Sequence, residues 1–307
     1  GSDVPSQTVI YGKKVTKPAT DPTKEGFVFA GWYTDDSYKT KFDFSKPITK
    51  ATTIYAKFRT VDVCNGFSTD SWSKIKTNLE SDPNYYPVGC EKEVELDIDD
   101  DNTPESYTVR LVNTSTPEEC DNDGYSQTAC GTVIEFKDII TKRRMNPYAN
   151  NGNSNGDGNR GGWEYSELRT YLNNDIFSML PTELQDIIID TKALSGHGYK
   201  DSSIFTTNDK LYFFSTVEIW ETQWGKRDTL DTTLTRQLDY YKNLEVTETN
   251  NNYVAIKNYD GDNTQWWLRS STSSNYYCFN NVSRSGAPTN YSSDSSMGVS
   301  PAFRIGS

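Results

Sequence analysis

The sequence predicts an α+β fold in which a small β module is followed by a larger domain of mixed helices and strands. Residues 4–58 contain short runs of β-branched and aromatic residues separated by prolines and glycine, which is typical of a small β module. Farther along, runs that alternate apolar and polar residues are interspersed with apolar residues at helical spacing. We therefore predict a module over residues 1–60, a linker over 59–65 and a second domain over 66–307.

The composition excludes several classes of protein. The chain has 307 residues, a formal net charge of -12 and a pI near 4.7, so it would repel the phosphate backbone of a nucleic acid. Mean hydropathy is -0.76, and no apolar run approaches the roughly 18 residues that a transmembrane segment needs. Gly1 and Ser2 are typical of a cloning remnant, so the sequence carries no information on a secretion signal. We expect a monomer without a transmembrane segment.

Three short strands are predicted in the first module, at Thr8–Tyr11, Phe27–Tyr33 and Thr53–Phe58. The module resembles the internalin B-type (Listeria-Bacteroides) repeat of Gram-positive surface proteins. The matching motifs, in order, are Val15-Thr16-Lys17-Pro18, Gly26-Phe27, Phe29-Ala30-Gly31-Trp32-Tyr33, Phe42-Asp43-Phe44, Pro47-Ile48-Thr49 and Ile54-Tyr55-Ala56-Lys57. The resemblance implies a β-grasp-like spacer in an extracellular protein attached to the cell surface of a Gram-positive bacterium.

The first half of the second domain is predicted to hold one helix and three strands. Apolar residues at helical spacing follow Asp70, which we expect to be the N-cap of a short helix over 72–79. Strands are predicted at 94–98, 107–112 and 132–136, the first two from alternating apolar and polar residues.

The middle of the domain is predicted to contain three helices and a central strand. The first helix covers 165–172, with Leu168 and Leu172 on one face. The second begins at Pro181 and continues through Ile188. The mostly apolar run 210–215 predicts a central strand, and leucines at helical spacing over 230–241 predict a third helix with a core-facing side.

The five cysteines favour an oxidising, extracellular setting over free thiols. Cys120 and Cys130 flank a turn, and a disulfide across that short loop would stabilise the fold by about 3 kcal/mol. Cys64 and Cys90 could pair in the same way, which leaves Cys278 as the odd cysteine. With one histidine and no pair of cysteines two residues apart, the sequence gives no reason to expect zinc.

Two apolar, strand-like runs near the C-terminus, Trp266–Arg269 and Gly298–Ile305, bracket the polar segment Ser270–Ser296. This segment contains no Lys, Glu, Gln, Trp or Met and is rich in Ser, Asn and Tyr. Tyrosine offers a large contact area at low entropic cost, so we interpret the segment as a ligand-binding loop that tolerates replacement, with a solvated surface loop as the alternative. The predicted ligand-binding residues are Ser271, Ser273, Asn275, Tyr276, Tyr277, Phe279, Asn281, Ser283, Arg284, Asn290, Tyr291, Ser292 and Asp294.

A second resemblance covers about two thirds of the chain. Its motifs are Gly162-Trp163, Ser166-Glu167-Leu168-Arg169, Leu172-Asn173, Leu180-Pro181, Asp209-Lys210-Leu211, Trp266-Trp267-Leu268-Arg269-Ser270 and Gly298-Val299-Ser300-Pro301-Ala302-Phe303-Arg304-Ile305. They are similar to an uncharacterised domain of surface proteins from gut Firmicutes and to the formylglycine-generating-enzyme branch of the C-type lectin fold. That fold also carries the variable proteins of diversity-generating retroelements. Randomised adenines there change Asn codons without producing the five residue types missing from Ser270–Ser296. The resemblance implies a C-type lectin-like domain with a diversifiable C-terminal binding surface.

The residues do not favour catalysis or a bound metal. The enzymes of this branch use a pair of cysteines that bind copper, whereas only Cys278 lies in the C-terminal part. His197 has no catalytic partner at a recognisable spacing. A calcium-loop pattern over Asn153, Asn155, Asp157, Gly158 and Glu164 lacks the first aspartate, and the acidic turn at Asp97–Asp101 is interpreted as solvated. We expect no enzyme activity, no cofactor and no metal.

Three functions are compatible with these patterns: an extracellular binding protein, an enzyme of the formylglycine-generating type, or a structural spacer. We favour the first, an adhesion or receptor-type protein whose partner is a protein or glycan on another cell, with no nucleic acid involved. If the C-terminal segment is not the binding site, the loop near His197 and the loop over 150–162 are the next candidates.

Overall fold

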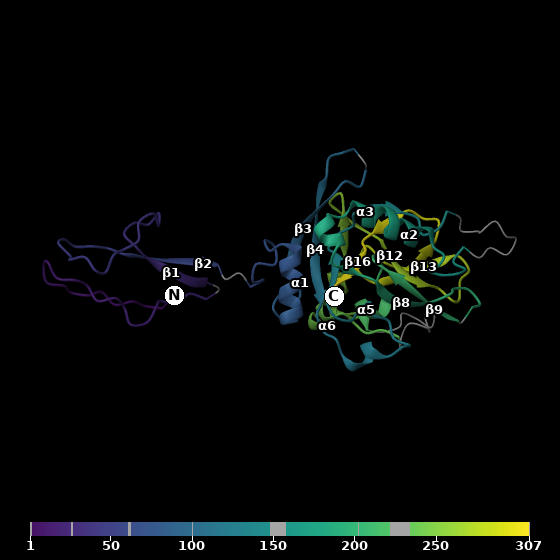
Figure 1. The fold of residues 1–307 in the computed structure, drawn as a ribbon, viewed down its shortest axis with the longest axis horizontal. Helices are drawn as coiled ribbons and strands as arrows, with labels where there is room; N and C mark the ends of the chain where they lie inside the picture. The colour runs from purple at the N-terminus through teal and green to yellow at the C-terminus, as the bar shows by residue number, and fades with distance from the viewer. Residues whose placement is uncertain are drawn as a thin grey trace. The chain divides into compact units, whose positions relative to one another are not determined.

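The structure is a computed structural model that describes residues 2–25, 27–60, 63–99, 101–147, 158–201, 203–221 and 234–306. The chain forms two compact units, unit 1 (Gly1–Val63) and unit 2 (Cys64–Ser307). The described secondary structure is mixed, with more strand than helix (Figure 1), which confirms the predicted α+β class. The predicted linker at 59–65 overlaps the last strand of unit 1, because that strand continues to Thr60.

Unit 1 is built on one antiparallel pair of strands, β1 (Phe27–Tyr33) and β2 (Tyr55–Thr60), with a bulge between Phe29 and Gly31. The strand predicted at Thr8–Tyr11 is wrong, because these residues pair with no other strand. Backbone hydrogen bonds hold the chain at the two residues that follow. There the Gly12 amide donates to the Ile48 carbonyl and the Ile48 amide to the Lys13 carbonyl, both at 2.8 Å. The N-terminal segment therefore crosses unit 1 as an irregular strap.

Two five-stranded sheets form unit 2. The first sheet has the order β3 (Glu91–Leu96), β4 (Glu105–Asn113), β5 (Val133–Phe136), β16 (Ala302–Ile305) and β7 (Ile188–Ile189). The second has the order β14 (Pro288–Ser292), β13 (Cys278–Val282), β12 (Trp266–Ser271), β15 (Met297–Val299) and β6 (Thr141–Arg143). Two hairpins accompany them, β8 (Thr191–Gly196) with β9 (Ile204–Asp209) and β10 (Lys257–Tyr259) with β11 (Asp262–Thr264).

Strands predicted from alternation or apolar character are present at both ends of unit 2. The predictions at 94–98, 107–112 and 132–136 correspond to β3, β4 and β5, with boundaries displaced by a few residues. The two apolar runs near the C-terminus form β12 and the pair β15 and β16. The central strand predicted at 210–215 is wrong, because this stretch, which is buried from Leu211 to Ser215, contributes only an isolated bridge from Tyr212 to Ala302.

Helix α1 (Trp72–Ser81) is present as predicted, but its N-cap is Ser71 rather than Asp70. The Ser71 hydroxyl accepts from the Lys74 amide at 3.3 Å. Asp70 instead pairs with the Lys74 ammonium at 2.6 Å and accepts from the Tyr86 hydroxyl at 2.7 Å. The N-cap is Ser71 because Ser and Asp both cap helices well and the Asp70 carboxylate already binds Lys74 and Tyr86.

The remaining helices are short. The predicted helix over 165–172 begins as α2 (Glu167–Tyr171) and continues through a π-helical turn (Leu172–Ile176) into α3 (Phe177–Met179), with Leu168 and Leu172 buried as expected. The helix predicted from Pro181 to Ile188 is only α4 (Thr182–Gln185), because Ile188 pairs in the sheet as β7. The other helical elements among the described residues are η1 (Glu118–Asp121), α5 (Thr216–Trp220), α6 (Asp239–Asn243) and η4 (Asn252–Ala255).

The helix predicted over 230–241 is helical only from Asp239, and its first four residues lie outside the described part of the chain. Both predicted disulfides are formed, Cys64–Cys90 and Cys120–Cys130. Cys278 is buried in β13 and belongs to neither bond. A continuous apolar core in unit 2 joins residues of α1, both sheets and the segment 211–220.

Candidate ligand-binding site

The polar segment Ser270–Ser296 is not one continuous loop, because it contains the end of β12 and the whole of β13 and β14, which corrects the sequence-based interpretation. β13 and β14 form a hairpin that pairs Phe279 with Tyr291 and Val282 with Pro288. The turn closes where the Ser283 amide donates to the Ala287 carbonyl at 2.8 Å, and Gly286 takes a φ of +82° there. The composition of the segment does not indicate β13, because the buried positions of this strand include the polar residues Asn280 and Asn281.

The predicted binding residues therefore differ in exposure. Ser271, Phe279 and Asn281 are buried and cannot contact a macromolecular ligand, because each belongs to a strand packed on both faces. The other predicted residues are exposed or half-buried: Ser273, Asn275, Tyr276, Tyr277, Ser283, Arg284, Asn290, Tyr291, Ser292 and Asp294.

Most of these accessible residues lie near the two ends of the β13–β14 hairpin, and Asn290, opposite Asn280, lies midway along it. Ser273 to Tyr277 precede β13, and the Ser293 amide donates to the Tyr277 carbonyl at 2.8 Å, so Ser292 and Asp294 lie near this end. Ser283 and Arg284 form the turn at the other end, roughly 20 Å away along the strand at about 3.4 Å per residue. The accessible residues therefore extend over the length of the hairpin, and its two ends can be tested separately.

At the Tyr277 end, three loops that are distant in sequence converge on the buried side chain of Asn159. The loops are 158–165 before α2, 197–203 between β8 and β9, and 272–277 between β12 and β13. The Asn159 side-chain nitrogen Nδ2 lies 2.8, 2.8 and 2.9 Å from the carbonyl oxygens of Thr272, Asn275 and Cys278, which share its two N–H donors. Its Oδ1 accepts from the Tyr199 amide at 3.3 Å, and its own amide donates to the Tyr276 carbonyl at 3.1 Å.

Two glycines permit this convergence. Gly162 has a φ of +55°, and a Cβ there would lie 2.3 Å from the Gly196 carbonyl oxygen. Gly198 has a φ of +98°, and a Cβ there would lie 2.4 Å from the Asn159 carbonyl oxygen. Any side chain at either position would push two of the loops apart, so both residues are confined to glycine.

The converged loops, which we call the Asn159 loop cluster (158–165, 197–203 and 272–277), present tyrosines to solvent. Tyr276 is 42% exposed and its ring meets those of Tyr277 and Tyr199 edge-on, with centroids 4.8 and 5.8 Å apart. Tyr165, in the first loop, is 73% exposed. Rigidly held aromatic rings beside exposed backbone and small polar side chains are suited to contacting another molecule.

His197 joins two of these loops through carboxylates. Its Nδ1 lies 3.1 Å from Asp201 Oδ2, and its Nε2 lies 3.3 Å from Glu164 Oε2 without making a hydrogen bond. The ring stacks on Phe205 with centroids 4.8 Å apart. Hydrogen bonds from the Ser203 hydroxyl and amide, and from His197, lower the pKa of Asp201 to about 2, so this carboxyl stays charged.

The His197 group does not have the geometry of a serine nucleophile with its base. Ser203 Oγ lies 3.0 Å from Nδ1, the same ring nitrogen that faces Asp201. A carboxylate only accepts hydrogen bonds, so Nδ1 carries the proton and cannot take one from Ser203. The Ser203 hydroxyl itself donates to Asp201 Oδ1. This arrangement orders a loop and does not activate a hydroxyl.

A buried ion pair joins helix α5 to β12, the strand that precedes one of the cluster loops. Arg269, on β12, makes two contacts of 2.7 Å with the carboxylate of Glu218 on α5, and its Nε donates to Ser195 Oγ on β8 at 3.2 Å. Ser271 then donates to the Gly196 carbonyl at 3.0 Å. Figure 1 shows β12 and β13 beside β8 and β9, so one framework holds the two hairpins whose loops form the cluster.

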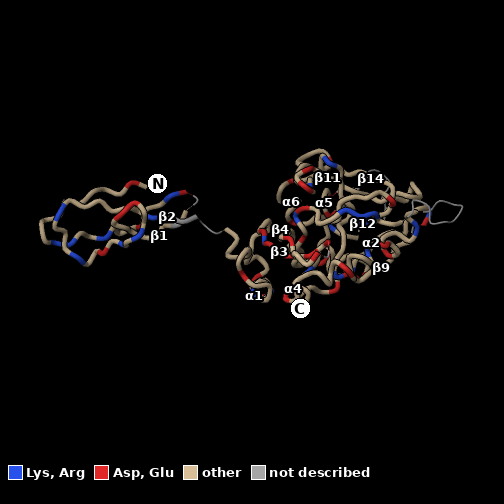
Figure 2. Tube along the Cα trace, turned by 90° about the horizontal axis from the view of Figure 1, so that it is seen from above, with Lys and Arg blue, Asp and Glu red and all other residues tan. Residues whose placement is uncertain are grey.

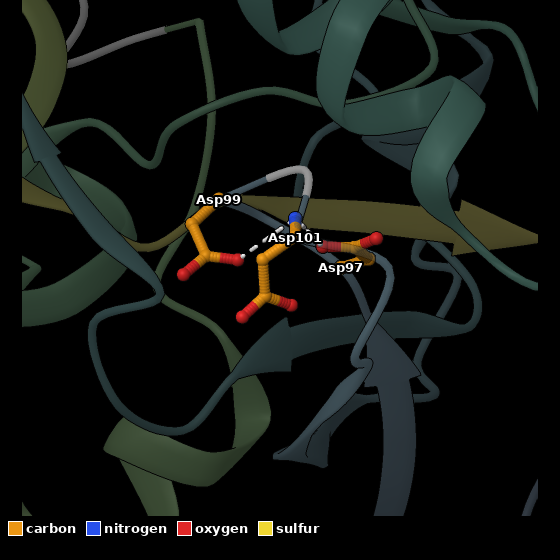
Figure 3. A group of neighbouring side chains, drawn as sticks. All are labelled: Asp97, Asp99 and Asp101. Atoms are coloured by element: carbon orange, nitrogen blue, oxygen red, sulfur yellow. Dashed lines mark hydrogen bonds between the residues drawn. The ribbon is translucent and has the colours of Figure 1, made fainter.

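The acidic turn lies elsewhere, between β3 and β4. Among the described residues, Asp97, Asp99 and Asp101 offer oxygen atoms within 4.8 Å of one another (Figure 3). Such oxygens suit a hard cation, but Asp97 already accepts from the amides of Asp101 and Asn102, at 3.1 and 2.9 Å. These turn hydrogen bonds explain the convergence of the side chains without an ion.

Three residues of the calcium-loop pattern, Asn153, Asn155 and Asp157, lie outside the described residues. Sequence patterns alone do not indicate that Asn159, Glu164, Tyr165 and Tyr199 belong to one site. The glycines at 161, 162, 196 and 198 were the available signal, because close approach of loops requires them.

The chain is a two-part protein whose larger unit holds three converging loops on a scaffold of two sheets. A family model described as "Domain of unknown function (DUF6273)" matches residues 131–307, and the chain belongs to this family. A second model, described as "Listeria-Bacteroides repeat domain", matches residues 1–57, so the predicted N-terminal repeat is confirmed. Comparisons with curated proteins and with solved structures returned no match.

These findings are consistent with an extracellular protein. Unit 1 matches the Listeria-Bacteroides repeat, and unit 2 contains two disulfides, which persist in oxidising compartments. In the parts of the chain that the structure describes, every helix is too short or too polar to span a bilayer.

Proposed function

We propose that this chain is a ligand-binding protein of the Gram-positive cell surface, of the adhesion or receptor type. Unit 2 is a C-type lectin-like scaffold that binds a protein or glycan on another cell through the Asn159 loop cluster. Unit 1 is a β-grasp-like spacer between the binding unit and the surface. The protein acts as a monomer and binds without catalysis.

One observation carries the proposal: three separate loops are locked onto the buried Asn159 while their tyrosines remain outside. Rigid exposed rings lose little entropy on binding, which is why they dominate many interfaces. Tyr276 and Tyr165 satisfy both conditions, because their backbones are fixed and their rings are 42% and 73% exposed.

The same geometry limits which positions a diversity-generating mechanism could change. Ser273, Asn275, Tyr276, Tyr277 and Asn290 are accessible, so their replacement would alter the surface and leave the core intact. Asn280 and Asn281 lie in the interior and are constrained by packing. We propose that diversification, where it occurs, is concentrated at the accessible positions.

The test compares two ends of one hairpin. Labelled parent protein, the double variant Tyr276→Ser with Tyr277→Ser, and the control Arg284→Ser are applied to a glycan array and to intact epithelial and bacterial cells. Each lost aromatic contact should weaken binding by about 2 kcal/mol, roughly thirtyfold, whereas Arg284→Ser at the far turn should bind as the parent does. Equal binding by all three proteins would place the site elsewhere, and no binding by the parent would favour a spacer.

A further inference from the structure

His197, the one histidine of the sequence, lies between two carboxylates that belong to different loops of the Asn159 loop cluster. Its Nδ1 faces Asp201 of its own loop at 3.1 Å, and its Nε2 faces Glu164 of the loop 158–165 at 3.3 Å. The side chain of His197 is 25% exposed, so protons can exchange between the ring and water. The contact with Glu164 therefore joins two loops through a group that titrates.

The protonation state of the ring decides whether this contact attracts or repels. Asp201 only accepts hydrogen bonds, so Nδ1 carries a proton in either state. In the neutral ring Nε2 is an acceptor, and this buried atom, which has no hydrogen-bond partner among the described residues, faces a second acceptor, the Glu164 carboxylate. In the imidazolium both nitrogens carry protons and each faces a negative charge. Protonation therefore makes a costly contact favourable.

The other charged groups near the two loops have other neighbours. Figure 2 shows residues of both signs around α2 and β9, which adjoin these loops. Lys200 Nζ lies 4.8 Å from the centroid of the Tyr199 ring, Arg169 pairs with Asp209 at 2.7 Å, and Arg160 is exposed. The third loop, 272–277, contains no Asp, Glu, Lys or Arg. In the part of the chain that the structure describes, the charged groups paired with the ring are both carboxylates.

The contact between His197 and Glu164 lies beside an exposed tyrosine. The Gly161 amide donates to the His197 carbonyl at 2.8 Å, and a Cβ on Gly161 would lie 2.3 Å from Tyr165 Cδ2. Tyr165 follows Glu164 directly in the sequence and is 73% exposed. A change in the spacing of His197 and Glu164 therefore acts on the segment that positions the Tyr165 ring.

We propose that His197 is a pH-dependent switch between the loops 158–165 and 197–203. The imidazolium holds Glu164 and Asp201 together, and loss of the Nε2 proton to water makes the Glu164 contact repulsive and loosens the segment 161–165. Histidine side chains ordinarily titrate between about pH 5 and 8, where carboxylates remain charged, so the segment is most ordered at the acidic end of this range. As regulation of ligand binding through Tyr165 the switch rests on the proposed function of unit 2, whereas the change in loop order does not.

The experiment uses the full chain without ligand, in buffer that contains EDTA, from about pH 5 to about pH 8. Proton NMR of the imidazole records the titration directly, because the chain has one histidine. Hydrogen exchange of the Gly161 amide, corrected for its intrinsic rate, records the contact between the loops. Its protection should be about threefold higher when His197 is protonated, as for a partly exposed ion pair, and should fall along the same curve as the His197 signal.

Two variants that each remove one negative charge locate the switch. Glu164→Gln should make the protection of the Gly161 amide independent of pH, because an amide side chain can accept from the imidazolium and donate to the neutral ring. The His197 signal of this variant should titrate at a lower pH than in the parent, since one of the two carboxylates that favour the imidazolium is gone. Glu167→Gln is the matched control, at an exposed position in the first turn of α2, and should keep the pH dependence of the parent.

The proposal is overturned if protection of the Gly161 amide in the parent does not follow the His197 titration. It is also overturned if Glu164→Gln keeps the pH dependence of the parent, or if Glu167→Gln removes it as completely as Glu164→Gln does. Because no ligand is present, none of these outcomes bears on whether the loop cluster binds one. A parent protein that binds no glycan or cell would likewise leave the measured change in loop order as it is.

Discussion

At the scale of single residues, Trp267 and Tyr276 separate framework from contact surface. Trp267 is fully buried on β12, and its indole donates to the Arg143 carbonyl at 2.8 Å. Trp267→Ala should lower the free energy of unfolding by about 3 to 5 kcal/mol, because it empties a core site. Tyr276→Ser should cost about 0.5 kcal/mol, as at a surface position. Chemical denaturation of both variants measures the difference, and the opposite order would reverse the assignment.

Asn159 is the residue on which the shape of the loop cluster depends. Replacing it with alanine removes a donor from the carbonyls of Thr272, Asn275 and Cys278, of which the last two keep a hydrogen bond from the Thr272 hydroxyl, and should cost about 1 to 3 kcal/mol. The loss should be local, so amide exchange should rise over 272–278 while the strands of the first sheet keep their protection. Asn173→Ala, which removes side-chain donors to Arg169 and Leu211, is a matched control expected to leave 272–278 unchanged. A uniform rise in exchange would show that Asn159 is a global core residue instead.

At the scale of elements, Asp239 joins helix α6 to the end of β4 and gives unit 2 a dependence on pH. Burial alone would raise the pKa of Asp239, but hydrogen bonds from Arg236, Ser115 and Thr114 hold it below its usual value. A lowered pKa in the folded state stabilises the fold above the ordinary aspartate pKa of about 3.9, and this stability is lost as the pH falls through the folded value.

The variant Asp239→Asn should therefore be less stable than the parent at pH 7 by about 1 to 3 kcal/mol. The gap should narrow as the pH falls from about 4, the ordinary aspartate pKa, through the lowered pKa of the Asp239 carboxyl in the folded state. Thermal melts from pH 7 to pH 2 test this, with Asp262→Asn, an exposed position on β11, as the control. A gap that is constant over this range would mean that the hydrogen bonds, and not the charge, carry the effect.

The core residues of the β13–β14 hairpin determine which part of the C-terminal segment can be replaced without unfolding unit 2. Replacing all of 271–296 with an unrelated Ser, Asn and Tyr sequence should unfold unit 2, because Phe279 and Val282 belong to the core. Exchanging only 273–277 should preserve the melting temperature within a few degrees, since these residues precede β13 and none of them is fully buried. Thermal melts of the two variants followed by circular dichroism test this prediction. A folded variant with 271–296 replaced would contradict the assignment of β13 and β14.

The elements that the sequence predicts correctly are those whose pattern matches their burial. β3 alternates between exposed and buried residues over its last four positions, β4 is buried over its last five, and Cys120 and Cys130 flank the turn that their disulfide closes. β13 was missed because Asn280 and Asn281 are buried, which no polarity pattern indicates. The run 210–215 was assigned to a strand because burial alone does not distinguish a strand from a buried connection. The Asn159 loop cluster depends on hydrogen bonds between residues more than a hundred positions apart, so local sequence could not predict it.

At the scale of the whole molecule, the division into two units predicts independent behaviour. A protease in limiting amount should cut between Thr60 and Cys64, because β2 ends at Thr60 and Cys64 is bonded into unit 2. The released unit 2 should melt at the temperature of the second transition of the full chain. Mass spectrometry of the fragments and calorimetry test both points. One cooperative transition that resists cutting would show that the two units fold together.

The disulfide between Cys64 and Cys90 gives the chain a defined path for mechanical force. If unit 1 is held by one surface and the ligand of unit 2 by another, tension enters unit 2 at Cys64. The covalent bond passes that tension directly to Cys90, next to the first residue of β3, so the intervening loop with helix α1 bears none of it. Pulling then loads β3, which is hydrogen-bonded along its length to β4, while the apolar contacts of α1 stay intact. Under reducing conditions the same pull would peel α1 away first, and the chain would lengthen before the sheet is strained.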